Sequence, residues 1–223
     1  MILHLLMAGL LAGTPSPLEM ARDAQDRPAL TRMVDEAVAA AAKAPQDAAA
    51  QFRVALGSSY LAEVEIQAHD KEAGHRAAVR GIQAAERAIK LQPNDPEGYR
   101  VLGTLCGQAI TNILSGLNYG PRAKDAINKA VSLAPKSSPV WVARGVGNYY
   151  MPSQFGGGAA QAAADFRKAI DLDANNAEAW LWLGIALRKQ NQDAEARQAF
   201  GKALALDPNR VWARQQLDKT PTK

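Results

Sequence analysis

The side chains of this chain that could bind a metal or catalyse a reaction are few and scattered. His69 and His75 flank a short polar stretch that contains Asp70 and Glu72. Zinc accepts imidazoles and carboxylates as ligands, but a zinc site also needs them to converge, and this spacing does not impose that geometry. Polar side chains in an exposed turn are the commoner explanation, so we predict no metal site.

Candidates for covalent or acid–base catalysis are also lacking. Cys106 is the single cysteine, so it has no partner for an internal disulfide, and its inward position in a predicted helix favours a small buried hydrophobic side chain. No Ser, Thr or Cys stands in a strained turn beside a histidine. We predict that the chain is not an enzyme, has no catalytic residue and needs no cofactor.

Two aromatic segments are better candidates for a binding surface. They contain Tyr119 in residues 117–121, and Tyr149, Tyr150 and Phe155 in residues 148–158, which end in three glycines. Aromatic rings offer contact area to a partner, and glycine N–H groups before a helix favour an anion. Alternatively, the glycines supply the positive φ that a turn needs and the rings pack the loops together. Both alternatives stay open, and we expect the four rings to lie close together.

The elements that must position these side chains follow a repeat. Between Ala177 and Arg210, seven residues occupy fixed offsets of a 34-residue period: Trp180, Leu183, Gly184, Ala196, Phe200, Ala203 and Pro208. The first three share one face of a helix, the next three share one face of a second helix, and the proline ends the pair. We expect Gly184 and Ala196 where the two backbones cross, with Trp180 and Phe200 filling the space beside them.

This spacing resembles the tetratricopeptide repeat, and three degenerate copies precede it. The nearest copy is marked by Trp141, Gly145, Ala162, Phe166 and Ala169. The four copies end alike, in KLQPND, SLAPKS, DLDANN and ALDPNR. The resemblance implies an all-α, right-handed solenoid of three to four helix pairs with capping helices, in which each unit contacts only its neighbours.

The copies shorten along the chain. From Leu56 to Ala88 the first copy is 12 residues longer than the standard unit, and the excess falls to 8, then 5, then none. All the extra residues lie around the turn between the two helices of a unit. If two helices share an excess of 12, each is longer by roughly 9 Å. The sequence therefore predicts a solenoid that tapers from its N-terminal end.

The sequence divides into three parts. Residues 1–27 are predicted to be a signal peptide and linker, residues 28–45 a capping helix, and residues 46–223 the solenoid with a final capping helix. Ile2 to Gly13 is an uncharged apolar run of twelve residues, shorter than the about 20 that a membrane-spanning helix needs. We predict a periplasmic or secreted protein without a stable transmembrane span. The alternative is membrane association through an uncleaved N-terminal segment.

Charge excludes one class of partner and marks one unusual residue. The net charge is +4, but Lys and Arg alternate with Asp and Glu in every unit, and no basic run interleaves with aromatic residues. A nucleic-acid surface is therefore not expected. Arg144 occupies a repeat position that is normally Leu, and we expect it to pair with Asp165 on the facing helix.

The inner-groove positions of the repeats predict an apolar groove rather than a clamp for a peptide carboxylate. Of these positions only Arg100 is cationic, and no Asn stands beside it. The groove candidates are Arg100, Val142, Val146, Leu181 and Ile185. Such a groove suits an amphipathic helix or an extended hydrophobic segment of a partner. The chain's own terminal helices or a second copy could fill it instead, so self-association is also considered.

These observations favour a non-catalytic protein–protein interaction scaffold of the bacterial cell envelope, with a protein or peptide partner. The segment NYYMPSQFGGG is also distantly similar to the T-component of TRAP transporters, over roughly residues 96–209. That resemblance implies an alternative, a periplasmic accessory component of a transporter that handles a small ligand through the glycine-rich edge.

Overall fold

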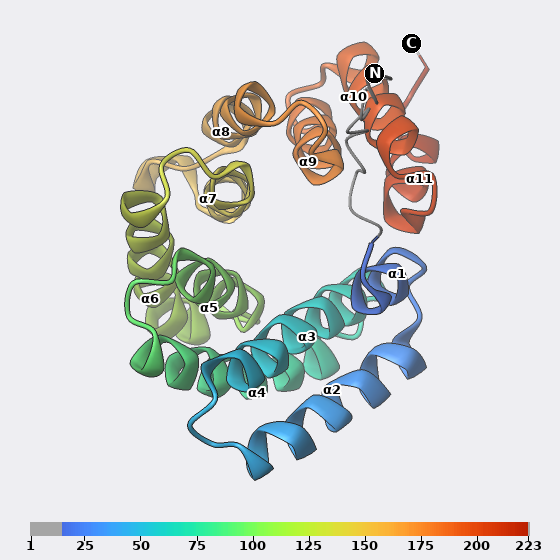
Figure 1. The fold of residues 1–223 in the computed structure, drawn as a ribbon. Helices are drawn as coiled ribbons and strands as arrows, with labels where there is room; N and C mark the ends of the chain where they lie inside the picture. Colours follow the sequence, from blue (N-terminus) through green and yellow to red (C-terminus); the bar gives the residue numbers. More distant parts are fainter. Residues whose placement is uncertain (1–14, 223) are drawn as a thin grey trace, which may run out of the picture.

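A computed structural model of the chain describes residues 15–222. Within this range it contains α-helices, one short 3-10 helix and no strand. Figure 1 shows the helices following one another around a ring, so that α1 (Pro17–Asp23) lies near α11 (Val211–Asp218). The predicted signal segment, Ile2 to Gly13, falls outside the described residues.

Four antiparallel helix pairs form the body of the ring. The pairs are α3 (Ala48–Gln67) with α4 (Lys71–Leu91), α5 (Pro96–Gln108) with α6 (Ile113–Leu133), α7 (Ser138–Tyr150) with α8 (Ala159–Leu172), and α9 (Ala177–Arg188) with α10 (Asp193–Leu206). Helices α2 (Arg27–Lys43) and α11 cover the two ends. This arrangement confirms the predicted all-α solenoid with capping helices.

Short turns of one length join successive pairs. Each turn has four residues. In two of them the last residue caps the next helix, because the side chains of Asp95 and Asn176 accept hydrogen bonds from backbone N–H groups in the first turns of α5 and α9. These bonds satisfy donors that a helix start otherwise leaves open. The repeated endings of the four copies are therefore the local reason why all the pairs begin and end alike.

Contacts between glycine and phenylalanine fix the register of the last two pairs. A Cβ atom on Gly184 would lie 2.6 Å from the ring of Phe200, and one on Gly145 would collide with the ring of Phe166 in the same way. Both rings are completely buried. The predicted close crossing of the helices is thus correct for these units.

Aromatic residues at the fourth position of three units make the same contact. Trp180 donates its indole N–H to the carbonyl of Ala174 at 2.9 Å, and Trp141 donates to that of Pro135 at 2.8 Å. The Tyr99 hydroxyl donates to the carbonyl of Pro93 at 3.1 Å. Each acceptor lies six residues earlier, in the preceding turn. Trp180 is therefore only half-buried and holds a turn, whereas Phe200 alone fills the helix crossing.

The taper arises mainly from helix length. Helices α3 and α4 have 20 and 21 residues, whereas α9 and α10 have 12 and 14. In the third unit the excess forms the loop 151–158. In the second unit it extends α6, so residues 117–121 lie inside a helix and the turn is 109–112. Their expected place in a turn is wrong, because Asn112 and Ser115 form a capping box that starts α6 earlier.

The segment before the first capping helix is also more ordered than a linker. Residues 17–23 form α1, which begins with a capping box between Ser16 and Glu19. Ala21 and Asp23 of this helix are buried against the rest of the chain. The prediction of a signal peptide and linker over residues 1–27 is thus corrected for residues 17–23, since side chains of α1 contribute to the packed structure.

The glycine register gives a stability prediction with an internal control. Gly184→Ala should lower the free energy of unfolding by about 1–3 kcal/mol, because its methyl group would overlap the Phe200 ring. Gly201→Ala, in α10 of the same unit, should raise it by about 0.5–1 kcal/mol, because a Cβ atom there meets nothing within 4 Å. Denaturant unfolding of both variants measures the two effects. Equal shifts of the two midpoints would show that the register is wrong.

Candidate functional site

The inner wall of the ring is formed by α3, α5, α7 and α9, which face the centre in Figure 1. The predicted groove residues lie on these helices, but Val142, Leu181 and Ile185 are buried within the C-terminal core and Val146 packs against it. Arg100 is paired with Glu97 at 2.8 Å. An open apolar groove at these positions is therefore not present, because neighbouring first helices pack their inner faces against each other.

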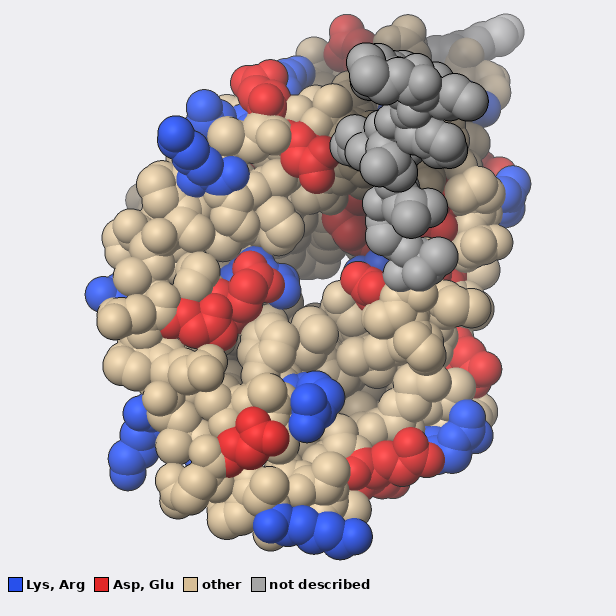
Figure 2. All heavy atoms as spheres, in the orientation of Figure 1, with Lys and Arg blue, Asp and Glu red and all other residues tan. Residues whose placement is uncertain are grey.

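The inner wall carries charged side chains instead of an apolar groove. Figure 2 shows acidic and basic side chains bordering the opening at the centre of the ring. Tyr60 of α3 lies among them, with the Arg22 guanidinium 4.7 Å from its ring centroid. Burial raises the pKa of the Tyr60 hydroxyl, so this group stays protonated at neutral pH.

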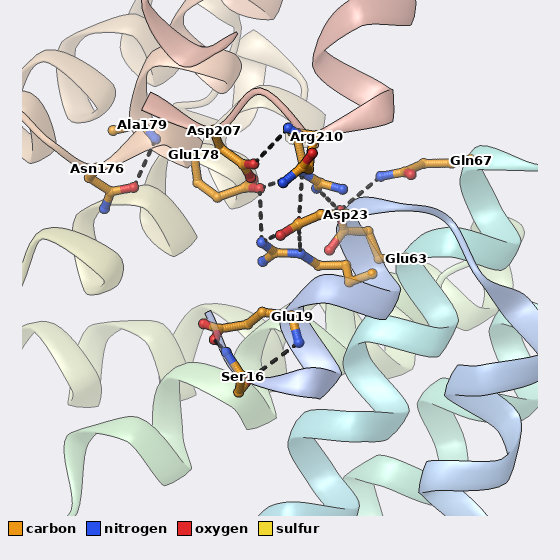
Figure 3. A network of polar contacts seen from close by, with 12 residues as sticks. Ser16, Glu19, Asp23, Glu63, Gln67, Asn176, Glu178, Ala179, Asp207 and Arg210 are labelled. Carbon is orange, nitrogen blue, oxygen red and sulfur yellow. Dashed lines mark hydrogen bonds and ion pairs between the residues drawn. The ribbon is translucent and has the colours of Figure 1, made fainter. Parts of the chain in front are cut away.

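The ring closes through one buried arginine. The side chain of Arg210, at the start of α11, is 2% exposed and contacts carboxylates from three separate segments. It binds Glu178 of α9 at 2.7 Å, pairs with Glu63 of α3, and lies 3.6 Å from Asp23 of α1 (Figure 3). Arg210 therefore joins the last turn of the solenoid to its first helices.

A second arginine completes this closure. Arg22 of α1 binds Asp23 at 2.6 Å and lies 3.7 Å from Glu178. Beside it, Gln25 receives a hydrogen bond of 3.1 Å from Gln215 of α11 and donates one of 2.7 Å to Gln67 of α3. We call the set Arg22, Asp23, Glu63, Glu178 and Arg210 the seam.

Burial and ion pairing shift the pKa values of the seam residues in opposite directions. Burial alone would raise the pKa of Glu178, but Arg210 and Arg22 together hold it below its ordinary value. Burial raises the pKa of Asp23, and Arg22 offsets this only in part. Burial alone would lower the pKa of Arg22, yet Glu178 and Glu63 raise it, so the guanidinium remains charged. Glu178 thus contributes stability above its unfolded pKa, and this contribution is lost as pH falls through its lower folded pKa.

None of the seam residues was predicted, although one signal existed. The four-residue turns end in Asp95, Ser137, Asn176 and Arg210. Asp, Ser and Asn can cap the following helix, but arginine has no acceptor atom, and Arg210 makes no capping hydrogen bond. An arginine in place of a cap residue therefore marks a side chain with another role.

The glycine-rich loop has a structural role. The N–H groups of Gly156, Gly157 and Gly158 donate to the carbonyls of Ser153, Pro152 and Asn148. Gly156 and Gly158 have φ values of +86° and +105°, where glycine is favoured. The N–H groups are thus used within the loop, which contradicts the anion-binding interpretation and supports the alternative of a tight turn.

The four aromatic rings do not form one cluster. Tyr149 and Tyr150 lie edge to face, 5.1 Å apart, and both contact Trp182 of α9. Tyr119 instead packs 6.3 Å from His75, in the N-terminal core. The expectation that Tyr119 joins the others is wrong, because it lies on α6 rather than in a turn. Phe155 is largely exposed in the loop.

The remaining candidate side chains are engaged within the fold. His75 places its Nδ1 atom 2.8 Å from the carbonyl oxygen of Ala109. Cys106 is completely buried, and burial raises its thiol pKa to about 11, so it stays protonated. Among residues 15–222 no group of three His, Cys, Asp or Glu side chains gathers as a metal site requires.

The predicted pairing of Arg144 with Asp165 is correct. The Arg144 Nε atom donates to the Asp165 carboxylate at 3.1 Å, and Asn148 donates to it at 2.7 Å. Asp165 is buried, and the guanidinium of Arg144 lies 3.9 Å from the ring centroid of Trp141. This cluster joins α7 to α8 and replaces the usual apolar contact.

The three most exposed large apolar side chains of residues 15–222 lie at the start of α6. Ile113, Leu114 and Leu117 are 87%, 78% and 71% exposed, and Ile110 in the preceding turn is 40% exposed. We call these four residues the apolar ridge. Residues 117–121 were expected to form a binding surface or a turn because of Tyr119, whereas the exposure of Ile110, Ile113 and Leu114 was not predicted.

The seam yields a prediction about shape. Arg210→Met should open the ring, because Glu63, Asp23 and Glu178 would lose their common cation. Removal of one partner from a buried ion pair typically costs about 3–5 kcal/mol. Arg214→Met, on an exposed position of α11, should change stability by no more than about 0.5 kcal/mol. Small-angle X-ray scattering should show a larger radius of gyration for Arg210→Met alone. An unchanged radius would mean that other contacts close the ring.

Comparison with known proteins identifies the repeat. Residues 177–210 match the family model of the tetratricopeptide repeat. A stretch of 99 residues is 35% identical to the peroxisomal targeting signal receptor of Kluyveromyces lactis, and it covers 43% of this chain but only 17% of that receptor. The chain therefore spans a small part of the receptor's length.

A solved structure shares the fold. TTC0263, a thermophilic tetratricopeptide-repeat protein of Thermus thermophilus, is similar with a TM-score of 0.62 and 19% identity, over 91% of this chain and 97% of that one. None of the helices in residues 15–222 has the length and apolarity needed to cross a membrane. Residues 177–210 therefore form a tetratricopeptide repeat, and the described chain has the fold of a tetratricopeptide-repeat solenoid.

Proposed function

We propose that the chain is a non-catalytic protein-interaction scaffold of the bacterial cell envelope that binds its partner through the apolar ridge. Tetratricopeptide solenoids present helical surfaces, and such surfaces serve as platforms for other chains. In this protein the inner wall is occupied by core packing and ion pairs. The apolar ridge contains the three most exposed large apolar side chains of residues 15–222, and so offers a surface for an apolar contact.

The exposure of the ridge is the observation that carries this proposal. Single apolar side chains on a surface need no explanation, but a contiguous set marks an interaction site. Ile113 and Leu114 lie in the first turn of α6 and Leu117 lies one turn further along, and Ile110 precedes them in the turn before the helix. They are exposed because α6 has 21 residues whereas its partner α5 has 13.

The non-catalytic part of the proposal is supported by the state of the reactive groups. The Cys106 thiol is buried and protonated, and His75 is held against a backbone carbonyl. Cysteine reacts as the thiolate, so a buried thiol with a raised pKa is a poor nucleophile. The small-ligand alternative depended on free glycine N–H groups, and those of the loop are already bonded.

The envelope location is supported by the apolar run from Ile2 to Gly13. Export of this kind predicts that the mature protein begins between residues 14 and 25, and an intact α1 narrows the start to residues 14–17. Cleavage further along would remove α1, which supplies Arg22 and Asp23 to the seam. N-terminal sequencing of protein from the native host measures the start. Recovery from the cytoplasm with Ile2 intact would contradict export, and a start beyond Pro17 would contradict the role of α1.

Binding through the ridge is tested by affinity capture from an envelope extract of the native host. Leu114→Asp should reduce the captured partner by at least about tenfold, because apolar anchors at such interfaces dominate the binding energy. Val38→Asp is the control, since Val38 is an exposed apolar residue on α2, outside the ridge. Equal capture by the two variants would refute binding at the ridge.

A further inference from the structure

We infer that the partner of the apolar ridge is a second copy of this chain, so that two chains associate about a two-fold axis at the start of α6. This inference rests on the proposed function, which assigns the ridge to protein binding, and it names the partner. Three observations support the second copy as the partner. They are the extension of α6 past α8, the absence of charged residues in the sequence around the ridge, and two glycines of α6 next to the ridge.

The ridge projects because the units differ in height. Helices α6 and α8 end at equivalent residues, Leu133 and Leu172, but α6 has 21 residues and α8 has 14. Seven further residues extend the start of α6 by roughly 10 Å. The apolar side chains of these first turns therefore extend past the start of α8, on the side of the shorter third unit, whereas α4 on the other side is as long as α6. Another chain can reach them there without opening the ring.

The ridge lies in an uncharged stretch of the sequence. Residues 104–121 contain no Asp, Glu, Lys or Arg. In a two-fold contact the same patch meets itself, so a charged residue near the axis would face its own like charge. The first charge after the ridge, Arg122, is held by Glu86 of α4. An uncharged patch fits a copy of itself, whereas it offers no charge pattern by which a different partner could be selected.

Packing among residues 15–222 does not require glycine at two positions of α6. Gly116 and Gly120 are one turn apart, and a Cβ atom on Gly120 would meet nothing within 4 Å. The nearest atom to a Cβ on Gly116 is the Ile110 Cγ2 atom at 3.7 Å, an ordinary contact. Glycine weakens a helix interior relative to alanine. Close approach of a second helix accounts for both, in contrast to Gly184, which faces Phe200 of its own unit.

Sedimentation velocity of the purified full-length chain, over a range of concentrations around micromolar, tests the inference. The wild type should form dimers. Leu114→Asp should raise the dimer dissociation constant by more than about a hundredfold, because each dimer would then place two like carboxylates in an apolar contact. Val38→Asp should leave it unchanged. Leu114 is exposed, so circular dichroism and thermal melting should show the variant to be folded as the wild type is.

Cross-linking locates the contact independently. In mildly oxidising buffer Leu117→Cys should form a disulfide-linked dimer, because the two copies of this residue lie near the axis. Lys129→Cys, about three turns further along α6, is also exposed and should remain largely monomeric. Cys106 is buried and should not interfere. Equal cross-linking of the two variants would overturn the assignment of the ridge.

The remaining outcomes separate this inference from the proposed function. A wild type that is monomeric throughout, or a dimer that Leu114→Asp leaves intact, would overturn the second-copy assignment. If the chain is monomeric but Leu114→Asp still abolishes capture of a different protein, the proposed function stands and this inference fails. If the wild type is monomeric and a thiol reagent cannot label Leu117→Cys, the ridge is covered within a single chain, and the inference also fails.

Discussion

The buried guanidinium of Arg210 is the interaction on which the shape of this protein depends. In a solenoid each unit contacts only its neighbours, so nothing in the repeats themselves holds the first unit to the last. Arg210 makes that connection by pairing with Glu63 of α3, Glu178 of α9 and Asp23 of α1. Once the ring is closed, the inner wall is confined, which supports our proposal that a partner binds on the outside.

A seam of this kind fixes one arrangement of the two ends of the ring but adds little to the free energy of unfolding. Two buried arginines face three carboxylates, and removing such groups from water costs much of what their attraction returns. The opposite pKa shifts of Glu178 and Asp23 reflect this balance. Hydrophobic side chains could join the ends as strongly, but they would do so in many arrangements. The fixed geometry of a guanidinium defines one arrangement, and so one curvature.

Local features were predictable from the sequence, and distant ones were not. The Gly184–Phe200 crossing and the Arg144–Asp165 pair follow from the repeat period, because each joins two helices of one unit. The seam joins Arg210 to Glu63, 147 residues apart, and no period relates them. The apolar ridge was missed for a local reason: Gly120 and Pro121 are typical of a turn, but the capping box at Asn112 starts the helix before them.

Ring closure is tested most directly by measuring the distance between its two ends in solution. Spin labels on Ala24→Cys and Arg214→Cys would lie on either side of the seam, at exposed positions next to the bonded pair Gln25 and Gln215. Cys106 is buried and should stay unlabelled. The closed ring predicts a single, short and narrow distance distribution between the labels. A long or broad distribution would show that the solenoid is open, and would contradict closure of the ring by Arg210.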